Sequence, residues 1–148
     1  MRIPLAWLAS TVLVVMTTAT IVGAEKKIQM KDLPAAVQNA IPDATRGATI
    51  KGYTREVEGG KTMYEVETMV NGHSRDLLFD ANGTLVEIEE AVGLETVPAA
   101  VRTALESRGR VLTVEQVTRG TTVSYEATVE KNGKKSEVAV GADGKPLK

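Results

Sequence analysis

The side chains best able to do chemistry are carboxylates that recur at every second position along predicted strands. Glu65 and Glu67 alternate with apolar residues in one stretch, and Asp76 follows in the next. The same alternation returns in the second half of the chain, at Glu126, Glu130 and Glu137. Because residues i and i+2 of a strand point to the same side, each set should line one face of a sheet. Such a face could attract a basic partner or a cation.

Other catalytic and metal-binding chemistry finds little support in the sequence. The chain has no Cys and a single His, His73, which we expect at an exposed hairpin tip. A zinc site or an activated nucleophile needs more partners than these. Asp80-x-Asn82-Gly83 resembles part of a calcium loop, but the remaining ligands and the bidentate Glu are missing, so we interpret it as a turn. No catalytic, metal-binding or cofactor-binding residue is therefore assigned, and no cofactor is expected.

A third acidic group, Glu87, Glu89 and Glu90, lies near the end of a predicted strand. We expect these side chains to be solvated, with at most a weak attraction for calcium. A general acid–base pair needs a pocket, and a flat sheet supplies none. An enzyme is therefore not expected.

The elements that position these carboxylates are duplicated. Three segments of the first half recur in the second: Leu33–Val37 as Val97–Val101, Tyr64–Val66 as Tyr125–Ala127, and Asn71–Gly72 as Asn132–Gly133. A repeat of about 60 residues indicates one supersecondary unit present twice. The expected repeats are residues 25–92 and 93–148, and two copies should share one core as a single domain.

Each copy opens with a helix signal. Asp32 and Thr96 are suited to the N-cap position, since their side-chain oxygens can accept from free backbone N–H groups. Apolar residues then follow at helical spacing, at Leu33, Val37, Ala40 and Ile41 and at Val97, Val101, Ala104 and Leu105. Pro42 should end or bend the first helix at Ile41, and the second helix should run through Arg108, before a glycine.

Strands follow each helix. We expect them at 48–57, 62–70, 73–80, 84–90, 111–118, 121–130 and 134–140, with a short stub at 145–147. Asn71-Gly72 and Asn132-Gly133 predict two-residue hairpins, because both turn positions need positive φ. The resulting register pairs Tyr64 with Phe79, Val66 with Leu77, Tyr125 with Val140, and Ala127 with Val138. All of these fall on one face, so the prediction is an α+β fold: two tandem α-β-β-β(-β) repeats forming one antiparallel sheet with the helices packed on that face.

The opposite face should carry the acidic side chains and a few apolar ones. Its candidate partner-binding residues are Met63, Glu65, Glu67, Met69, Asp76, Leu78, Glu126, Glu130 and Glu137. Glu67 should lie opposite Asp76, where like charges repel, and Glu130 opposite Lys135. The face is either an ordinary solvated surface or a docking surface for a basic loop or peptide.

Residues 1–24 are typical of an export signal. Arg2 precedes an apolar stretch, and small residues lead to an expected cut between Ala24 and Glu25. The alternative is an uncleaved membrane anchor, since the stretch approaches the length of a membrane span. The protein should be periplasmic or secreted, with no stable membrane anchor after cleavage. The net charge of −1 and the lack of a basic stripe give no indication of nucleic acid as a partner.

The pattern resembles the PepSY-like family, which is related in architecture to β-lactamase inhibitor proteins. The matching motifs are Leu33-Pro34-x-x-Val37, Ala40-Ile41, Gly47-Ala48-x-Ile50, Tyr64-Glu65-Val66, Asn71-Gly72 and Phe79-Asp80-x-Asn82-Gly83 with Leu85. The resemblance covers nearly all of residues 30–90 and is weaker over 94–148. It implies a tandem duplicated domain in an exported bacterial protein. Inhibition of peptidases or other hydrolases is the activity proposed for such domains. The inhibitor proteins use disulfides and an aromatic-rich sheet, which this chain lacks, so no inhibitory residue is carried over.

The expected function is that of an exported, non-catalytic binding module that docks a protein or peptide on its open acidic face, in the manner of a hydrolase inhibitor. The alternative is a periplasmic sensor that binds a cation or small ligand with the same carboxylates.

Overall fold

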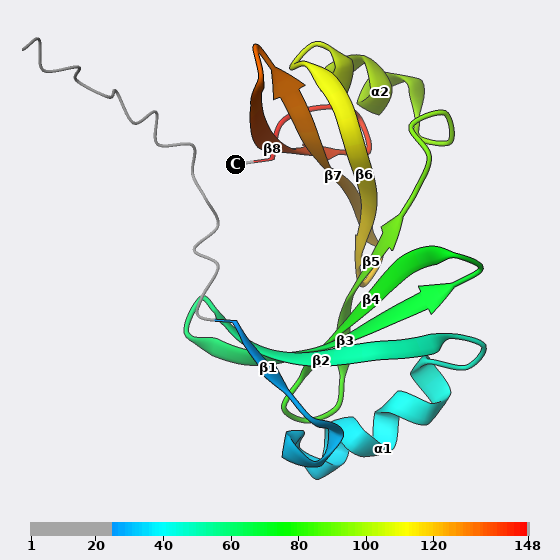
Figure 1. The fold of residues 1–148 in the computed structure, drawn as a ribbon, viewed down its shortest axis with the longest axis vertical. Coiled ribbons are helices and arrows are strands. Elements are labelled where there is room, and N and C mark those ends of the chain that lie inside the picture. The colour runs from blue at the N-terminus through cyan, green and yellow to red at the C-terminus, as the bar shows by residue number, and fades with distance from the viewer. Residues whose placement is uncertain (1–24, 148) are drawn as a thin grey trace, which may run out of the picture.

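The computed structural model describes residues 25–147, in which eight strands form one antiparallel sheet (Figure 1). The strands pair in sequence order: β1 (Lys26–Ile28), β2 (Thr49–Glu58), β3 (Lys61–Val70), β4 (His73–Asp80), β5 (Leu85–Ala91), β6 (Arg110–Arg119), β7 (Thr122–Lys131) and β8 (Lys134–Gly141). Within this part of the chain, no helix is long and apolar enough to cross a membrane. The predicted export signal, 1–24, lies outside the described residues.

Two α-helices cover one side of the sheet. The helix α1 (Ala35–Ala44) follows a single 3₁₀ turn, η1 (Met30–Asp32), and α2 (Ala99–Glu106) follows β5. The sheet bends through its middle strands, and both helices lie on the outer side of the bend (Figure 1). The predicted fold class is confirmed: two α-plus-strand repeats form one antiparallel sheet with the helices on one face. The sheet is curved, however, and the flat surface expected from the sequence is wrong.

The two Asn-Gly turns set the register as predicted. Asn71 and Asn132 have φ values of 51° and 53°, as the two-residue hairpin requires. The predicted strand pairs all occur: Tyr64 with Phe79, Val66 with Leu77, Tyr125 with Val140, and Ala127 with Val138. The seven longer predicted strands agree with the observed ones to within one residue at each end, whereas the predicted stub at 145–147 is only an isolated bridge between Pro146 and Val140. Only β1 had no counterpart in the sequence prediction.

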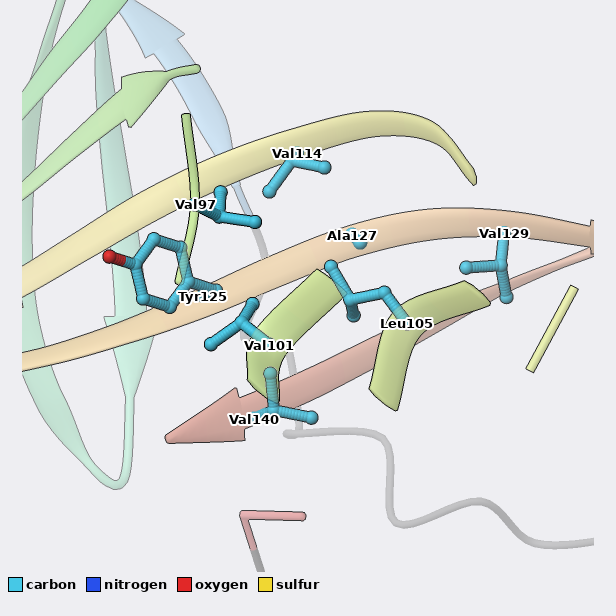
Figure 2. Packing of buried hydrophobic residues seen from close by; sticks show 8 residues of the cluster. All are labelled: Val97, Val101, Leu105, Val114, Tyr125, Ala127, Val129 and Val140. Atoms are coloured by element: carbon cyan, nitrogen blue, oxygen red, sulfur yellow. The ribbon is translucent and has the colours of Figure 1, made fainter. Parts of the chain in front are cut away.

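Each repeat packs its own hydrophobic core, so the single shared core expected from the duplication is wrong. In the first repeat, Val37 and Ile41 of α1, with Leu33 just before the helix, pack on Val66, Leu77 and Phe79. In the second, the cluster consists of Val97, Val101, Leu105, Val114, Tyr125, Ala127, Val129 and Val140 (Figure 2). The bend of the sheet separates the two helices, so each helix packs on its own half. The continuous sheet connects the two cores.

The helix ends differ from prediction. Both α-helices begin directly after a proline, and neither Asp32 nor Thr96 is an N-cap. Asp32 instead accepts a hydrogen bond from the Gln29 N–H at 3.0 Å, and the Thr96 hydroxyl donates to the Gly93 carbonyl at 2.7 Å. These side chains close the turn before each proline, so they are no longer available to the helix.

The C-terminal ends of both helices were also predicted wrongly. Pro42 lies within α1 and does not end it at Ile41. Near a helix end, a proline removes only one hydrogen bond, and the Thr45 N–H still reaches the Ile41 carbonyl at 2.9 Å. The helix α2 ends at Glu106, before the predicted Arg108.

Candidate functional site

The uncovered side of the sheet is concave and carries a row of carboxylates, which we call the acidic belt. Strand alternation places them all on the side opposite the two cores. The belt consists of Glu65, Glu67, Asp76, Glu87, Glu89, Glu115, Glu126 and Glu137. It therefore crosses from β3 to β8, inside the bend of the sheet (Figure 1).

Two pairs of carboxylates lie directly opposite each other on neighbouring strands. Asp76 of β4 faces Glu89 of β5, and Glu115 of β6 faces Glu126 of β7. Cross-strand neighbours have Cβ atoms about 5 Å apart, so like charges there are destabilising. Burial raises the pKa of all four groups, and neighbouring carboxylates add to the effect. Glu89 avoids the repulsion by keeping its proton at neutral pH, whereas the negative charge of Glu115 opposite Glu126 is held at a cost that a bound cationic group would relieve.

At the β3 end, Glu65 is the most perturbed group. Burial, followed by the charges of Asp76, Glu56 and Glu67, raises the pKa of Glu65 to about 7. Glu65 therefore changes charge near neutral pH.

Beside it, Glu67 has a fixed place. It lies over Gly52 of β2, where a Cβ would meet its carboxylate oxygen at 3.1 Å. The Thr54 hydroxyl donates to the Glu67 Oε1 at 3.1 Å. The absence of a side chain at Gly52 therefore leaves the space that this carboxylate occupies.

The middle of the belt contains an ion pair between a buried carboxylate and a half-exposed arginine. Glu87 of β5 has a side chain only 5% exposed, and it accepts a short hydrogen bond from the Arg119 guanidinium at the end of β6. Burial, together with a hydrogen bond to Glu87, raises the pKa of Glu89 well above its usual range, so this carboxyl is protonated at neutral pH. The prediction that Glu87 and Glu89 are solvated is wrong, because the bend encloses β5.

The β8 end of the belt lines an open hollow of about 700 Å³. Glu115, Glu126 and Glu137 contribute carboxylates to it, and Arg108 and Leu147 also line it. This hollow arises from the curvature and from the chain end folding back beside β8, where Pro146 bridges to Val140. A flat sheet would not have it.

All nine candidate partner-binding residues lie on strands β3, β4, β7 and β8, on the concave side. Six of them lie within or beside the belt: Glu65, Glu67, Asp76, Leu78, Glu126 and Glu137. Met63 and Met69 lie toward the two ends of β3, paired with Asp80 and Ser74.

Glu130 is the exception. It lies near the end of β7, where it pairs with Lys135 as predicted and binds the Arg110 guanidinium at 3.0 Å. Its charge is therefore already compensated, and the structure does not place it in the belt.

Sequence reasoning missed four participants: Glu115 and Arg119 were not considered, and Glu87 and Glu89 were set aside as solvent-exposed. The signal that could have found them is the period-two alternation of Glu115, Val117 and Arg119 along β6. A two-residue turn, Gly120-Thr121, joins this strand to β7 and fixes its face by pairing Arg119 with Thr122. That turn lacks the Asn-Gly signal of the other two hairpins, so the sequence analysis did not use it.

Within residues 25–147, no group of three or more His, Cys, Asp or Glu side chains is arranged to hold a metal ion. His73 is exposed, as predicted. The Asp80 carboxylate is engaged in a turn, accepting from the Asn82 and Thr84 N–H groups at 2.8 and 3.0 Å. The carboxylates of the acidic belt can therefore attract cationic groups and take up protons.

Comparison with known proteins identifies the fold. No family profile and no curated protein matches the chain. A BLIP-like protein from Bacteroides fragilis has a TM-score of 0.59 at 25% identity, over 78% of this chain and 84% of that one. A DUF2874 family protein from Bacteroides ovatus has a TM-score of 0.61 at 19% identity, over 78% and 85%. A protein provisionally described as periplasmic, from Bacteroides eggerthii, has a TM-score of 0.65 at 22% identity, over 78% and 86%. The resemblance to the BLIP-like fold is thereby confirmed, while fold alone does not assign an activity.

Proposed function

We propose that this protein is an exported, non-catalytic binding module that docks a basic loop or peptide of another protein in its concave face, in the manner of a hydrolase inhibitor. The observation that carries the proposal is the acidic belt itself, in which Glu115 faces Glu126 and Asp76 faces the protonated Glu89. Carboxylates held together at a cost are complementary to Arg or Lys side chains, which would relieve the repulsion.

The shape of the face supports a protein partner. The bend gives a concave surface that carries Met63 and Met69 toward the ends of β3 and Leu78 between Glu65 and Glu87, all three half-buried. Apolar side chains beside charged ones are typical of protein interfaces, where Met adapts to varied partners. The signal-like segment at 1–24 supports export to the periplasm or the medium, as does the periplasmic description of the similar protein from Bacteroides eggerthii.

The affinity for a basic partner should rise with pH. The pKa of Glu65 is raised to about 7, and burial also raises the pKa of Glu126. Glu65 becomes fully charged only as the pH rises above neutral, so binding should tighten between about pH 6 and pH 8. A partner that binds through apolar contacts alone would show no such trend.

The test is affinity capture from the native periplasm or culture supernatant, with captured proteins then measured individually by calorimetry. Glu65→Lys with Glu67→Lys should abolish specific binding. Glu95→Lys with Glu106→Lys makes the same charge change at exposed positions outside the sheet and should leave binding intact. Thermal unfolding of each variant confirms that it is folded. A partner list unchanged by the first pair would refute the proposal.

A second candidate is a sensor that binds a small cationic ligand, which the open hollow beside β8 favours. Calorimetric titration with calcium and with small organic amines separates it from protein docking. Binding heat that vanishes in Glu126→Gln would support the sensor, whereas flat heats up to millimolar concentrations would remove it.

A further inference from the structure

We propose that two copies of this chain associate edge to edge along β8, in an antiparallel ladder whose two-fold axis passes beside Ser136. The backbone ladder would form on the outer edge of the sheet, and Glu137 is the one belt side chain that it uses. Dimerisation is therefore tested on the isolated protein, without a binding partner. Three observations carry it: the free edge, the chain end that limits it, and the charges along it.

The edge is free because β8 is the last strand of the sheet and has β7 as its neighbour on one side only (Figure 1). The two-residue turn makes Lys131 and Lys134 a hydrogen-bonded pair. Alternation along an antiparallel ladder then directs the N–H and C=O groups of Ser136 toward β7 and those of Lys135 and Glu137 outward. Residues 134–137 are all exposed.

The chain end independently confirms this alternation and limits the edge. The next outward residue is Ala139, and its carbonyl accepts from the Leu147 N–H at 3.1 Å. The chain end therefore covers the edge at Ala139 and leaves Lys135 and Glu137 open. Only a short ladder can form there.

The order of charges makes this short edge complementary to itself. If Ser136 faces Ser136 of a second copy, Lys135 of each copy faces Glu137 of the other. These are the positions whose backbone groups point outward, so four backbone hydrogen bonds and two opposite-charge pairs form together. Among the described residues, Lys135 and Glu137 form no ion pair within their own chain, so both charges are available.

The same charges disfavour other occupants. A lysine on an exposed edge strand normally disfavours pairing with a strand from another chain. A shift of the two-fold axis by one residue, onto Lys135 or Glu137, sets like charges against each other. The lysine that protects the edge from foreign strands is neutralised in one register with a second copy.

The register can be tested by cross-linking, because the chain contains no cysteine. In the proposed ladder, the two Ser136 residues form a non-hydrogen-bonded pair with Cα atoms about 4.5 Å apart, which suits a disulfide. Ser136→Cys should therefore form a covalent dimer under mild oxidation. Lys134→Cys is the matched control: it is equally exposed on the same face, but the two residues would lie about 13 Å apart along the strands.

A charge exchange tests the same register without cysteine. Lys135→Glu alone and Glu137→Lys alone set like charges opposite each other and should give monomers by sedimentation at concentrations where the unmodified protein dimerises. The double variant Lys135→Glu with Glu137→Lys restores complementarity and should dimerise. An equimolar mixture of the two single variants should also dimerise, as a mixed pair.

The results of the two experiments either support the dimer or exclude it. Faster cross-linking of Ser136→Cys than of Lys134→Cys, with recovery in the double variant, supports it. Equal cross-linking rates, or a chain that stays monomeric at millimolar concentration, overturn it. Open-ended oligomers would also overturn it, because they require β8 to meet the opposite edge of the sheet at β1.

Discussion

Gly83 lies so close to the start of α1 that a Cβ on it would be 2.5 Å from the Ala36 carbonyl oxygen. Gly144 has the same relationship to Ala100 of α2, also at 2.5 Å. The two glycines occupy equivalent turns in the two repeats, with φ values of +81° and +77°. The turn after each hairpin therefore docks the helix of its own repeat, and the duplicated sequence preserves this contact.

Gly83→Ala and Gly144→Ala should each destabilise the protein by about 2–4 kcal/mol, since both the positive φ and the contact with the helix oppose a side chain. The measurement is the denaturant midpoint. Gly60→Ala is the control, because Gly60 also has a positive φ of +79° but has nothing within 4 Å of its Cβ position. It should cost only about 1 kcal/mol. Equal losses at Gly60 and Gly83 would show that the helix contact contributes nothing.

Truncation within either core should weaken the same cooperative transition. Ile41 and Leu105 belong to different clusters and are almost fully buried, so alanine at either position should cost about 2–5 kcal/mol. Because one sheet runs through both halves, we expect a single unfolding transition in both variants. Leu85→Ala, at a position 38% exposed, serves as the control. Two separate calorimetric transitions, with only one displaced by each variant, would contradict this expectation.

Local signals predicted two of the hairpin turns and the residues that face the helices, but not that these residues form two separate cores. Asn71-Gly72 and Asn132-Gly133 specify turn type, and turn type fixes which residues of the flanking strands share a face. The helix starts were harder, because Asp32 and Thr96 can serve either a helix or the preceding turn. The shape of the turn before each proline decided between these uses, and sequence does not encode that shape locally.

The middle of the acidic belt depends on long-range pairing. The β5 and β6 strands are joined by a connection that includes α2, so no short turn fixes which of their residues face each other. The burial of Glu87 and Glu89 then follows from the bend of the sheet. The period-two pattern predicts a shared face but gives no curvature, so it could not distinguish a solvated carboxylate from an enclosed one.

The protein should lose stability as the pH rises from about 5 to 9. Glu65 and Glu89 both have raised pKa values in the folded state, so the folded protein binds more protons than the unfolded chain over this range. Stability then falls with increasing pH, the reverse of the usual carboxylate trend. Chemical denaturation across this range measures the slope.

Glu89→Gln should flatten that slope and raise stability at pH 8 by about 1 kcal/mol, a value kept low because the side chain is partly exposed. The amide retains a donor for Glu87 while removing the charge. Glu106→Gln, at an exposed position on α2, should change nothing. A slope that is the same in Glu89→Gln and the unmodified protein would mean that Glu89 ionises normally.

The Arg119–Glu87 pair connects the two repeats and should stabilise the middle of the sheet. Arg119→Leu leaves the 5% exposed Glu87 side chain without this counter-charge, which should cost about 1–3 kcal/mol. The figure is below that of a fully buried pair because the arginine side chain is 51% exposed. Adding Glu87→Gln should recover most of the loss, since a neutral amide is less costly to bury than a charge. A double-mutant cycle by denaturation measures the coupling between the two residues. Additive losses would show that the two side chains act independently and that the β5–β6 backbone ladder alone holds the halves together.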